Sequence, residues 1–241
     1  MREWLFISDL HLAPERPQII QLFERFIDEV AISADRLYIL GDFLEYWIGD
    51  DDKADGLTDA FSALKRLGES KTDVFFMHGN RDFLVGDALA ERCRFKIIQD
   101  PLIENINDKP VLLMHGDSLC TDDIEYQKFR SMVRNRQWQD EQLSKPLEER
   151  ESIARSLREQ SQQATAGKSP EIMDVNQNTV TDIMKEHAVS LMIHGHTHRP
   201  AIHEFDIEGK PARRIVLGDW YETGSYLRIT EENHMDLMTF S

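Results

Sequence analysis

The first half of the chain alternates short apolar runs with amphipathic stretches. Four apolar runs have the length of buried strands: residues 3–8, 37–40, 73–77 and 110–114. The stretch after the first run repeats apolar residues at the spacing of one helix face, at Ile19, Leu22, Phe23, Phe26 and Val30. It predicts a helix over 18–31, and a similar pattern predicts a second helix over 57–67. Alternating strands and helices are typical of an α/β fold.

The second half of the chain has a different rhythm. A predicted helix over 171–187 is followed by five closely spaced apolar runs, at residues 189–193, 201–205, 213–217, 226–229 and 235–240. Turn residues such as Glu208-Gly209 lie between these runs, which favours antiparallel pairing. The whole pattern predicts two packed sheets flanked by helices.

One segment, about residues 126–166, is polar, helix-prone and free of strand runs. It begins with a basic cluster of Lys128, Arg130, Arg134 and Arg136. One interpretation is a solvated pair of surface helices. The other is a lid over a functional site, because insertions beside catalytic loops often select the substrate. The pattern alone supports both interpretations equally.

The composition is that of a folded protein with a strongly acidic surface. Of its 241 residues 41% are hydrophobic, which is enough for a substantial core in one domain with an insertion or in two small domains. The formal net charge of -16 disfavours a nucleic-acid partner, because such a surface repels the phosphate backbone. An anionic substrate would need concentrated positive charge, which metal ions supply compactly.

The cysteines and the start of the chain point to a reducing compartment. Cys93 and Cys120 are far apart and form no CxxC motif, so we expect both to be small core residues. Asp9 and His11 interrupt the first apolar run too early for a signal peptide, and no run approaches the roughly 18 residues of a membrane span. We therefore expect a cytoplasmic protein.

Polar clusters follow five of the apolar runs. They are Asp9-Leu10-His11, Gly41-Asp42, Gly79-Asn80-Arg81-Asp82, His115-Gly116-Asp117 and Gly195-His196-Thr197-His198. In open α/β sheets the carboxyl ends of the strands are where loops converge to form a site. The members of two pairs, Asp9 with His11 and His196 with His198, are two residues apart. In extended backbone, that spacing directs both side chains of a pair to the same side.

These clusters offer seven oxygen and nitrogen donors: Asp9, His11, Asp42, Asn80, His115, His196 and His198. Seven donors exceed the needs of one ion but suit two ions that share a carboxylate. Four imidazoles without thiolates favour Mn²⁺, Fe²⁺, Co²⁺ or Zn²⁺ over Mg²⁺. Any one cluster alone could be a turn or a cap, but five in order indicate a metal site.

The other histidines have a simpler interpretation. We expect them to be strand-end or surface residues: His78, His187, His194, His203 and His234. His78 and His194 lie close enough in sequence to the clusters to support the metal ligands.

The ordered motifs DLH, GDxxE (Gly41 to Glu45), GNRD, HGD and GHTH resemble the signature of the calcineurin-like metallophosphoesterase superfamily. Longer stretches, among them GDFLEYWIGDDD and IMDVNQN, resemble the UDP-2,3-diacylglucosamine pyrophosphatase family of lipid A biosynthesis in Gram-negative bacteria. This resemblance covers nearly the whole chain. It implies one domain over 1–241, built as a four-layer α/β/β/α sandwich of two mixed sheets, with a helical lid insertion over about 124–168.

The resemblance also implies a pair of Mn²⁺ ions and their ligands. One ion would be held by Asp9, His11, Asp42 and His198. The other would be held by Asp42, Asn80, His115 and His196, so that Asp42 bridges the two.

The implied reaction is hydrolysis of UDP-2,3-diacylglucosamine at the α-phosphorus, which gives UMP and 2,3-diacylglucosamine 1-phosphate (lipid X). The residues implied in catalysis are Asp42, Asn80, Arg81, His115 and His196. The implied substrate contacts are Asn80, Arg81, Asp123, Ser161, Thr165, Lys168 and His196. Thr165 stands where the family often has Asn, and it keeps a hydroxyl without the amide's paired donor and acceptor.

Two alternatives remain open at this point. One is a soluble nucleotide pyrophosphatase or phosphodiesterase on the same scaffold, which would differ in the insertion and in Asp123, Ser161 and Lys168. The other is a metal-free binding scaffold, which should have lost ligands, whereas this chain keeps every one.

The implied substrate is a lipid, so we expect peripheral contact with the cytoplasmic face of the inner membrane. The insertion has few large apolar residues, chiefly Trp138, Leu143, Leu147, Ile153 and Leu157, which predicts weak attachment. We expect neither a nucleic-acid partner nor an obligate protein partner.

Overall fold

The computed structural model describes residues 2–169 and 171–241; for Ser161, Gln162, Thr165 and Ala166 it describes the backbone alone. Within these residues the strands form two sheets. The first has the order β11 (Met235–Phe240), β10 (Gly224–Thr230), β1 (Glu3–Ile7), β2 (Arg36–Leu40), β3 (Asp73–Met77), β4 (Lys96–Ile98). The second has the order β5 (Leu102–Ile106), β6 (Lys109–Leu113), β7 (Leu191–His194), β9 (Lys210–Val216), β8 (Ala201–Ile207).

Both sheets are mixed. In the first, β1 to β4 run parallel, β10 pairs antiparallel with β1, and β11 pairs antiparallel with β10. In the second, β6, β7 and β9 run parallel and the edge strands β5 and β8 are antiparallel. Parallel strands end at the same edge of a sheet, so the loops that follow them meet there.

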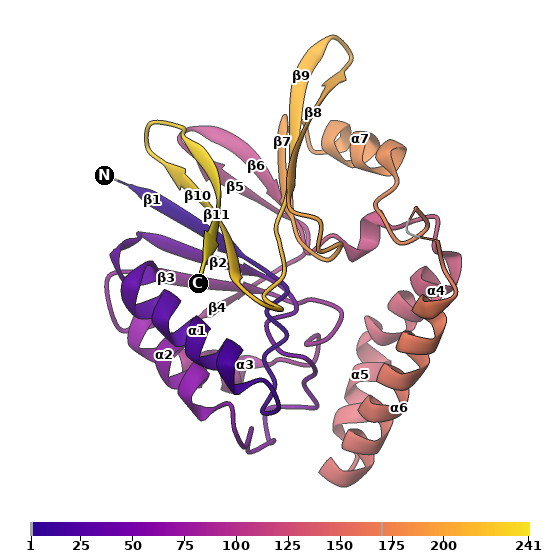
Figure 1. The fold of residues 1–241 in the computed structure, drawn as a ribbon. Coiled ribbons are helices and arrows are strands. Elements are labelled where there is room, and N and C mark those ends of the chain that lie inside the picture. The colour runs from indigo at the N-terminus through magenta and orange to yellow at the C-terminus, as the bar shows by residue number, and fades with distance from the viewer. Residues whose placement is uncertain (1, 170) are drawn as a thin grey trace.

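Figure 1 shows the two sheets with α1, α2 and α3 beside one of them and α7 beside the other. Among the described residues, three apolar cores lie between these four layers. The outer core lies between the first sheet and the helices α1 (Pro17–Glu29), α2 (Thr58–Gly68) and α3 (Asp87–Cys93). A second core fills the space between the sheets, and a third lies between the second sheet and α7 (Gln177–Glu186). The predicted α/β/β/α sandwich is therefore confirmed.

Strand β1 shows how the sequence produces these layers. Leu5 and Ile7 point into the core beneath α1, whereas Trp4 and Phe6 point into the core between the sheets. Side chains alternate between the two faces of a strand, and here both faces are covered. This explains why the strand reads as a continuous apolar run.

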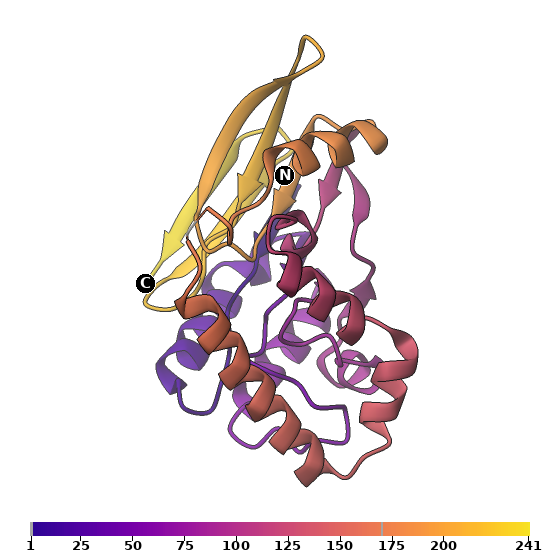
Figure 2. The same ribbon diagram turned by 90° about the vertical axis from the view of Figure 1, so that its right-hand side faces the viewer.

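The polar segment forms three helices rather than a pair: α4 (Ile124–Val133), α5 (Arg136–Leu143) and α6 (Leu147–Ala166). Figures 1 and 2 show them grouped on one side of the sheets, apart from α1, α2 and α3. The short 3-10 helix η2 (Asp117–Leu119) leads from β6 to α4; another, η1 (Ala31–Ser33), follows α1. None of the helices in the described ranges is long and apolar enough to cross a membrane.

The expected helix over 171–187 is wrong at its start. Residues 171–174 form turns, and α7 begins at Gln177, because the side chain of Asn176 accepts hydrogen bonds from the amides of Asn178 and Thr179. An Asn at this position satisfies free amide groups of the first helical turn. The sequence analysis did not predict helix α3, strands β4 and β5, or the 3-10 helices η1 and η2.

Candidate metal centre and substrate cavity

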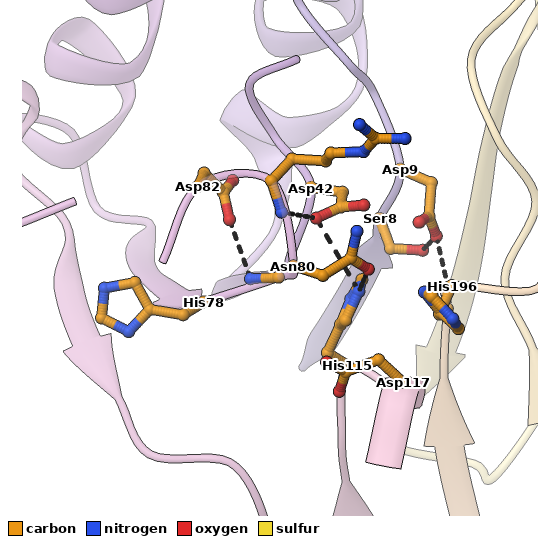
Figure 3. Close-up of polar contacts among 12 residues, drawn as sticks. Ser8, Asp9, Asp42, His78, Asn80, Asp82, His115, Asp117 and His196 are labelled. Atoms are coloured by element: carbon orange, nitrogen blue, oxygen red, sulfur yellow. Dashed lines mark hydrogen bonds and ion pairs between the residues drawn. The ribbon is translucent and has the colours of Figure 1, made fainter. Parts of the chain in front are cut away.

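The seven predicted donors gather at one edge, where the loops of both sheets meet. Asp9 and His11 follow β1, Asp42 follows β2 and Asn80 follows β3, while the remaining three come from the second sheet: His115, His196 and His198. Figure 3 shows Asp42 and Asn80 directed toward His115, and Asp9 beside His196. Packing of the two sheets thus brings together residues up to 189 positions apart, Asp9 and His198 being the outermost.

The backbone at the site is unusual. Five of the seven donors have positive φ: Asp9 (56°), His11 (48°), Asp42 (51°), His196 (68°) and His198 (55°). The expectation that each pair converges through extended backbone is therefore wrong. Asp9 and His11 still belong to one donor set, whereas His196 and His198 belong to different sets. Non-glycine residues with positive φ cost free energy and cluster at functional sites.

The donors form two sets that could each hold a cation. The ligand atoms of Asp9, His11 and His198 lie within 4.8 Å of one another, and so do those of Asp42, His115 and His196. In the first set, Nε2 of His198 lies 3.3 Å from Oδ1 of Asp9 and 3.3 Å from Nε2 of His11.

Asp42 lies between the two sets. Its Oδ2 is 3.8 Å from Nε2 of His11, and its Oδ1 is 3.8 Å from Nε2 of His115. The carboxylate therefore presents one oxygen to each set. Asn80 joins the second set, because its Oδ1 lies 3.0 Å from Nε2 of His115.

The chemistry of the donors fits divalent cations. Oδ1 of Asp9 is buried and has no hydrogen-bond partner among the described residues, whereas Oδ2 accepts bonds from Ser8 and the amide of His196. Burial opposes ionisation, but the surrounding histidines hold the pKa of Asp9 below its usual range. Burial and His115 lower the pKa of His196 to about 4, so its imidazole is neutral. A buried carboxylate requires positive charge nearby, and a neutral imidazole offers the nitrogen lone pair that binds a metal ion.

Asp82 supports the loops beneath the donors, a role that the sequence motif did not assign. This fully buried carboxylate accepts hydrogen bonds from the amides of Gly79 (2.8 Å), Phe43 (2.8 Å) and Leu44 (3.3 Å). It therefore ties the loop after β2 to the loop after β3. Burial and the neighbouring Asp42 raise its pKa to about 6.

The two histidines expected to support ligands differ in what they contact. Nδ1 of His194 lies 2.8 Å from the carbonyl of Gly195, next to His196, and its Nε2 accepts from Arg214 at 3.1 Å. It therefore holds the GHTH loop in place. His78 instead bonds the carbonyl of Val85 at 2.7 Å.

Glu45, the last residue of GDxxE, was not assigned a role. Its Oε2 lies 3.2 Å from Nδ1 of His11, although the pair is not aligned as a hydrogen bond, and its Oε1 is 3.0 Å from Nε of Arg158 in α6. A carboxylate behind a histidine ligand commonly orients the ring.

A cavity of about 290 Å³ lies between helices α4 to α6 and the loops of the site. Its polar lining includes Asn80, Arg81, Asp123 and Lys168, four of the predicted substrate contacts. Its apolar lining includes Trp47, Phe83, Phe129, Trp138, Ile153 and Leu157. A pocket with this division suits a ligand with a charged head and an apolar tail.

The other predicted residues divide as follows. His196 lies in the second donor set, and the side chains of Ser161 and Thr165 lie outside the described residues. Two apolar residues expected in the lid, Leu143 and Leu147, do not line the cavity.

Fold and site together define a phosphoesterase with paired donor sets. Residues 4–200 match the calcineurin-like phosphoesterase family, and the chain belongs to it. The chain is 48% identical to the UDP-2,3-diacylglucosamine hydrolase of Marinobacter nauticus over 97% of this chain and 96% of that one. It is 51% identical to the UDP-2,3-diacylglucosamine hydrolase of Chromohalobacter salexigens, over 90% and 88% of the two chains.

A solved structure adds support for the fold alone. A hypothetical protein of Pyrococcus horikoshii OT3 is 10% identical and aligns with a TM-score of 0.50, over 100% of this chain and 88% of that one.

Proposed function

We propose that this chain hydrolyses UDP-2,3-diacylglucosamine at the α-phosphorus and gives UMP and 2,3-diacylglucosamine 1-phosphate for lipid A biosynthesis. One observation carries the proposal. Asn80 belongs to the donor set of His115 and also lines a cavity whose lining includes apolar side chains of the lid, among them Phe129 and Trp138. The names of relatives that are 48% and 51% identical support the same substrate.

Two Mn²⁺ ions are proposed as the cofactors. Asp9, His11, Asp42 and His198 would hold one, and a second group would hold the other: Asp42, Asn80, His115 and His196. When bound, two such ions activate a water molecule and offset the charge on the phosphoryl group.

The proposed catalytic residues are Asp42, Asn80, Arg81, His115 and His196. Arg81 lines the cavity next to Asn80, where its guanidinium can grip two phosphate oxygens. A guanidinium is a poor proton donor, which suits a leaving group that is already an acidic phosphate. Asp123 and Lys168 are proposed to bind the sugar and phosphate portions.

We infer one domain over 1–241 with residues 124–168 as its lid. Pairing of β10 with β1 supports this inference, because the end of the chain completes the sheet that the beginning starts. A purely nucleotide substrate would leave the apolar half of the cavity unfilled, which disfavours the soluble nucleotide pyrophosphatase.

Peripheral contact with the cytoplasmic face of the inner membrane is inferred from the lipid substrate. Three lid residues with exposed apolar side chains support it: Ile124, Met132 and Leu143. Such a contact needs no spanning segment.

The decisive experiment is product analysis with UDP-2,3-diacylglucosamine, with and without Mn²⁺. We expect UMP and 2,3-diacylglucosamine 1-phosphate only when Mn²⁺ is added back to metal-free protein. Incorporation of ¹⁸O from labelled water into UMP would locate the attack at the α-phosphorus. Turnover of UDP-glucose at an equal rate would instead favour a general nucleotide pyrophosphatase.

A further inference from the structure

The basic cluster at the start of the lid divides into two pairs. Lys128 and Arg136 point outward, with 68% and 91% of their side chains exposed. Arg130 and Arg134 turn inward, and only 23% and 20% of their side chains are exposed. The inward pair contacts the loops that carry the proposed metal ligands.

Arg134 holds two main-chain carbonyls of the loop after β3. Its Nη2 donates to the carbonyl of Gly79 at 3.0 Å and to that of His78 at 3.2 Å. The amides of the same loop are held by carboxylates of the site instead, since Gly79 donates to Asp82 and Arg81 donates to Asp42, both at 2.8 Å. Buried carbonyls require partners, and here the lid provides them.

The Gly79 backbone packs tightly against the site. A Cβ atom on Gly79 would lie 2.1 Å from Oδ1 of Asp42 and 2.2 Å from its amide nitrogen. The peptide therefore packs directly against the carboxylate between the two donor sets, and it precedes Asn80 in the chain. Any shift of this peptide moves both residues.

Arg130 anchors helix α4 to the loop after β6, where Nη2 of Arg134 also lies 3.9 Å from Oδ2 of Asp117. Nε of Arg130 donates to Oδ2 of Asp117 at 2.8 Å, and the hydroxyl of Tyr126 donates to that oxygen at 3.0 Å. Asp117 is fully buried and lies two residues beyond His115. Helix α4 thus contacts the loops after both β3 and β6.

We propose that Arg134 is a positioning residue for the reaction. By holding the Gly79 peptide, Arg134 fixes the positions of Asn80, Arg81 and Asp42 relative to one another. The first lid helix therefore helps to support the metal centre. This inference rests on the proposed metal centre but not on the identity of the substrate.

The test compares Arg134→Met, which keeps the aliphatic packing but removes the donors, with Arg134→Lys, which keeps one donor group. The matched control is Arg136→Ala, because Arg136 is exposed and pairs only with Asp140 among the described residues. Two properties are measured: Mn²⁺ affinity of metal-free protein by calorimetry, and kcat and KM for bis(p-nitrophenyl) phosphate, a diester too small to need the lid.

We expect Arg134→Met to weaken Mn²⁺ binding and to lower kcat, each by about tenfold or more, with little change in KM. Arg134→Lys should lose less, and Arg136→Ala should match the wild type. If circular dichroism shows that Arg134→Met does not fold, Arg134→Lys becomes the deciding variant. It should then show a loss of both Mn²⁺ affinity and kcat.

Wild-type Mn²⁺ affinity and kcat in the deciding variant would overturn the proposal, as would an equal loss in Arg136→Ala. A change confined to KM would make Arg134 a substrate contact and also overturn it. Neither measurement uses the diacylated substrate. If that substrate is not hydrolysed, the proposed function is wrong, but the test of Arg134 remains valid.

Discussion

Nζ of Lys168 lies 2.6 Å from Oδ2 of Asp123, and this ion pair joins the two ends of the proposed lid. Asp123 directly precedes α4 and Lys168 follows α6. Asp123 also caps α4, because its Oδ1 accepts the amide hydrogen of Tyr126 at 3.1 Å. Asp123 and Lys168, two proposed substrate contacts, therefore form an ion pair at the base of the proposed lid, which we call the clasp, and both also line the cavity.

The clasp predicts that Asp123 and Lys168 are energetically coupled. Asp123→Asn, which keeps the cap, and Lys168→Met should each destabilise the fold, and the double variant should lose less than the sum. The expected coupling is about 1 kcal/mol, because the pair is only partly shielded from water. Urea unfolding of the four proteins measures it. Strict additivity would show that the ion pair contributes nothing.

Asp42→Ala should remove the carboxylate that lies between the two donor sets. We expect loss of Mn²⁺ content and a fall in kcat by several orders of magnitude, because neither set retains a full complement of donors. Metal analysis and steady-state kinetics measure both effects. The exposed Asp59 on α2 provides the control, Asp59→Ala. Near-normal activity of well-folded Asp42→Ala would end the bridging assignment.

Arg81→Ala should act mainly on the transition state. If the guanidinium grips the phosphoryl oxygens as charge develops, kcat falls more than KM rises. Arg81→Lys should recover only part of the rate, since a single ammonium cannot make two parallel bonds. A pure KM effect would make Arg81 a ground-state binding residue instead.

The lid should decide which substrate is cleaved. Replacing residues 136–157 by a Gly/Ser linker removes Trp138, Ile153 and Leu157 from the cavity but keeps Arg134 on Gly79. Hydrolysis of bis(p-nitrophenyl) phosphate should persist, while hydrolysis of the diacylated UDP-sugar falls steeply, because each buried methylene contributes about 0.8 kcal/mol. Parallel loss of both activities would make the segment a structural support alone.

The two thiols should be unreactive in the folded protein. Burial raises the pKa of Cys93 and Cys120 to about 12, so at pH 8 only about one thiol in ten thousand is ionised. Both should react with a disulfide reagent only after unfolding. In the folded protein the pKa of each thiol lies above its unfolded value of about 8.5. The contribution of the two protonated thiols to the free energy of unfolding is therefore complete below pH 8.5 and is lost as pH rises toward 12. Thermal unfolding measured across that pH range checks that stability falls as pH rises. Rapid labelling of the thiols in native protein would contradict the prediction that they are unreactive.

The sequence by itself determined the layers and the family. Continuous apolar runs such as Trp4 to Ile7 identify strands covered on both faces, and the motif order DLH, GDxxE, GNRD, HGD and GHTH predicts a metal site at the ends of those strands. These features are local, because periodicity and strand-end chemistry depend on residues that are neighbours in the chain.

Only the tertiary structure decided which side chains support that site. Arg134 reaches Gly79 across 55 residues, and Arg158 reaches Glu45 behind His11 across 113 residues. The sequence could show that Arg134 and Arg136 are both basic, but not that one turns inward and the other stays in solvent. The reason is physical: the packing of α4 to α6 against the loops of two different sheets sets these contacts, and no local repeat encodes that packing.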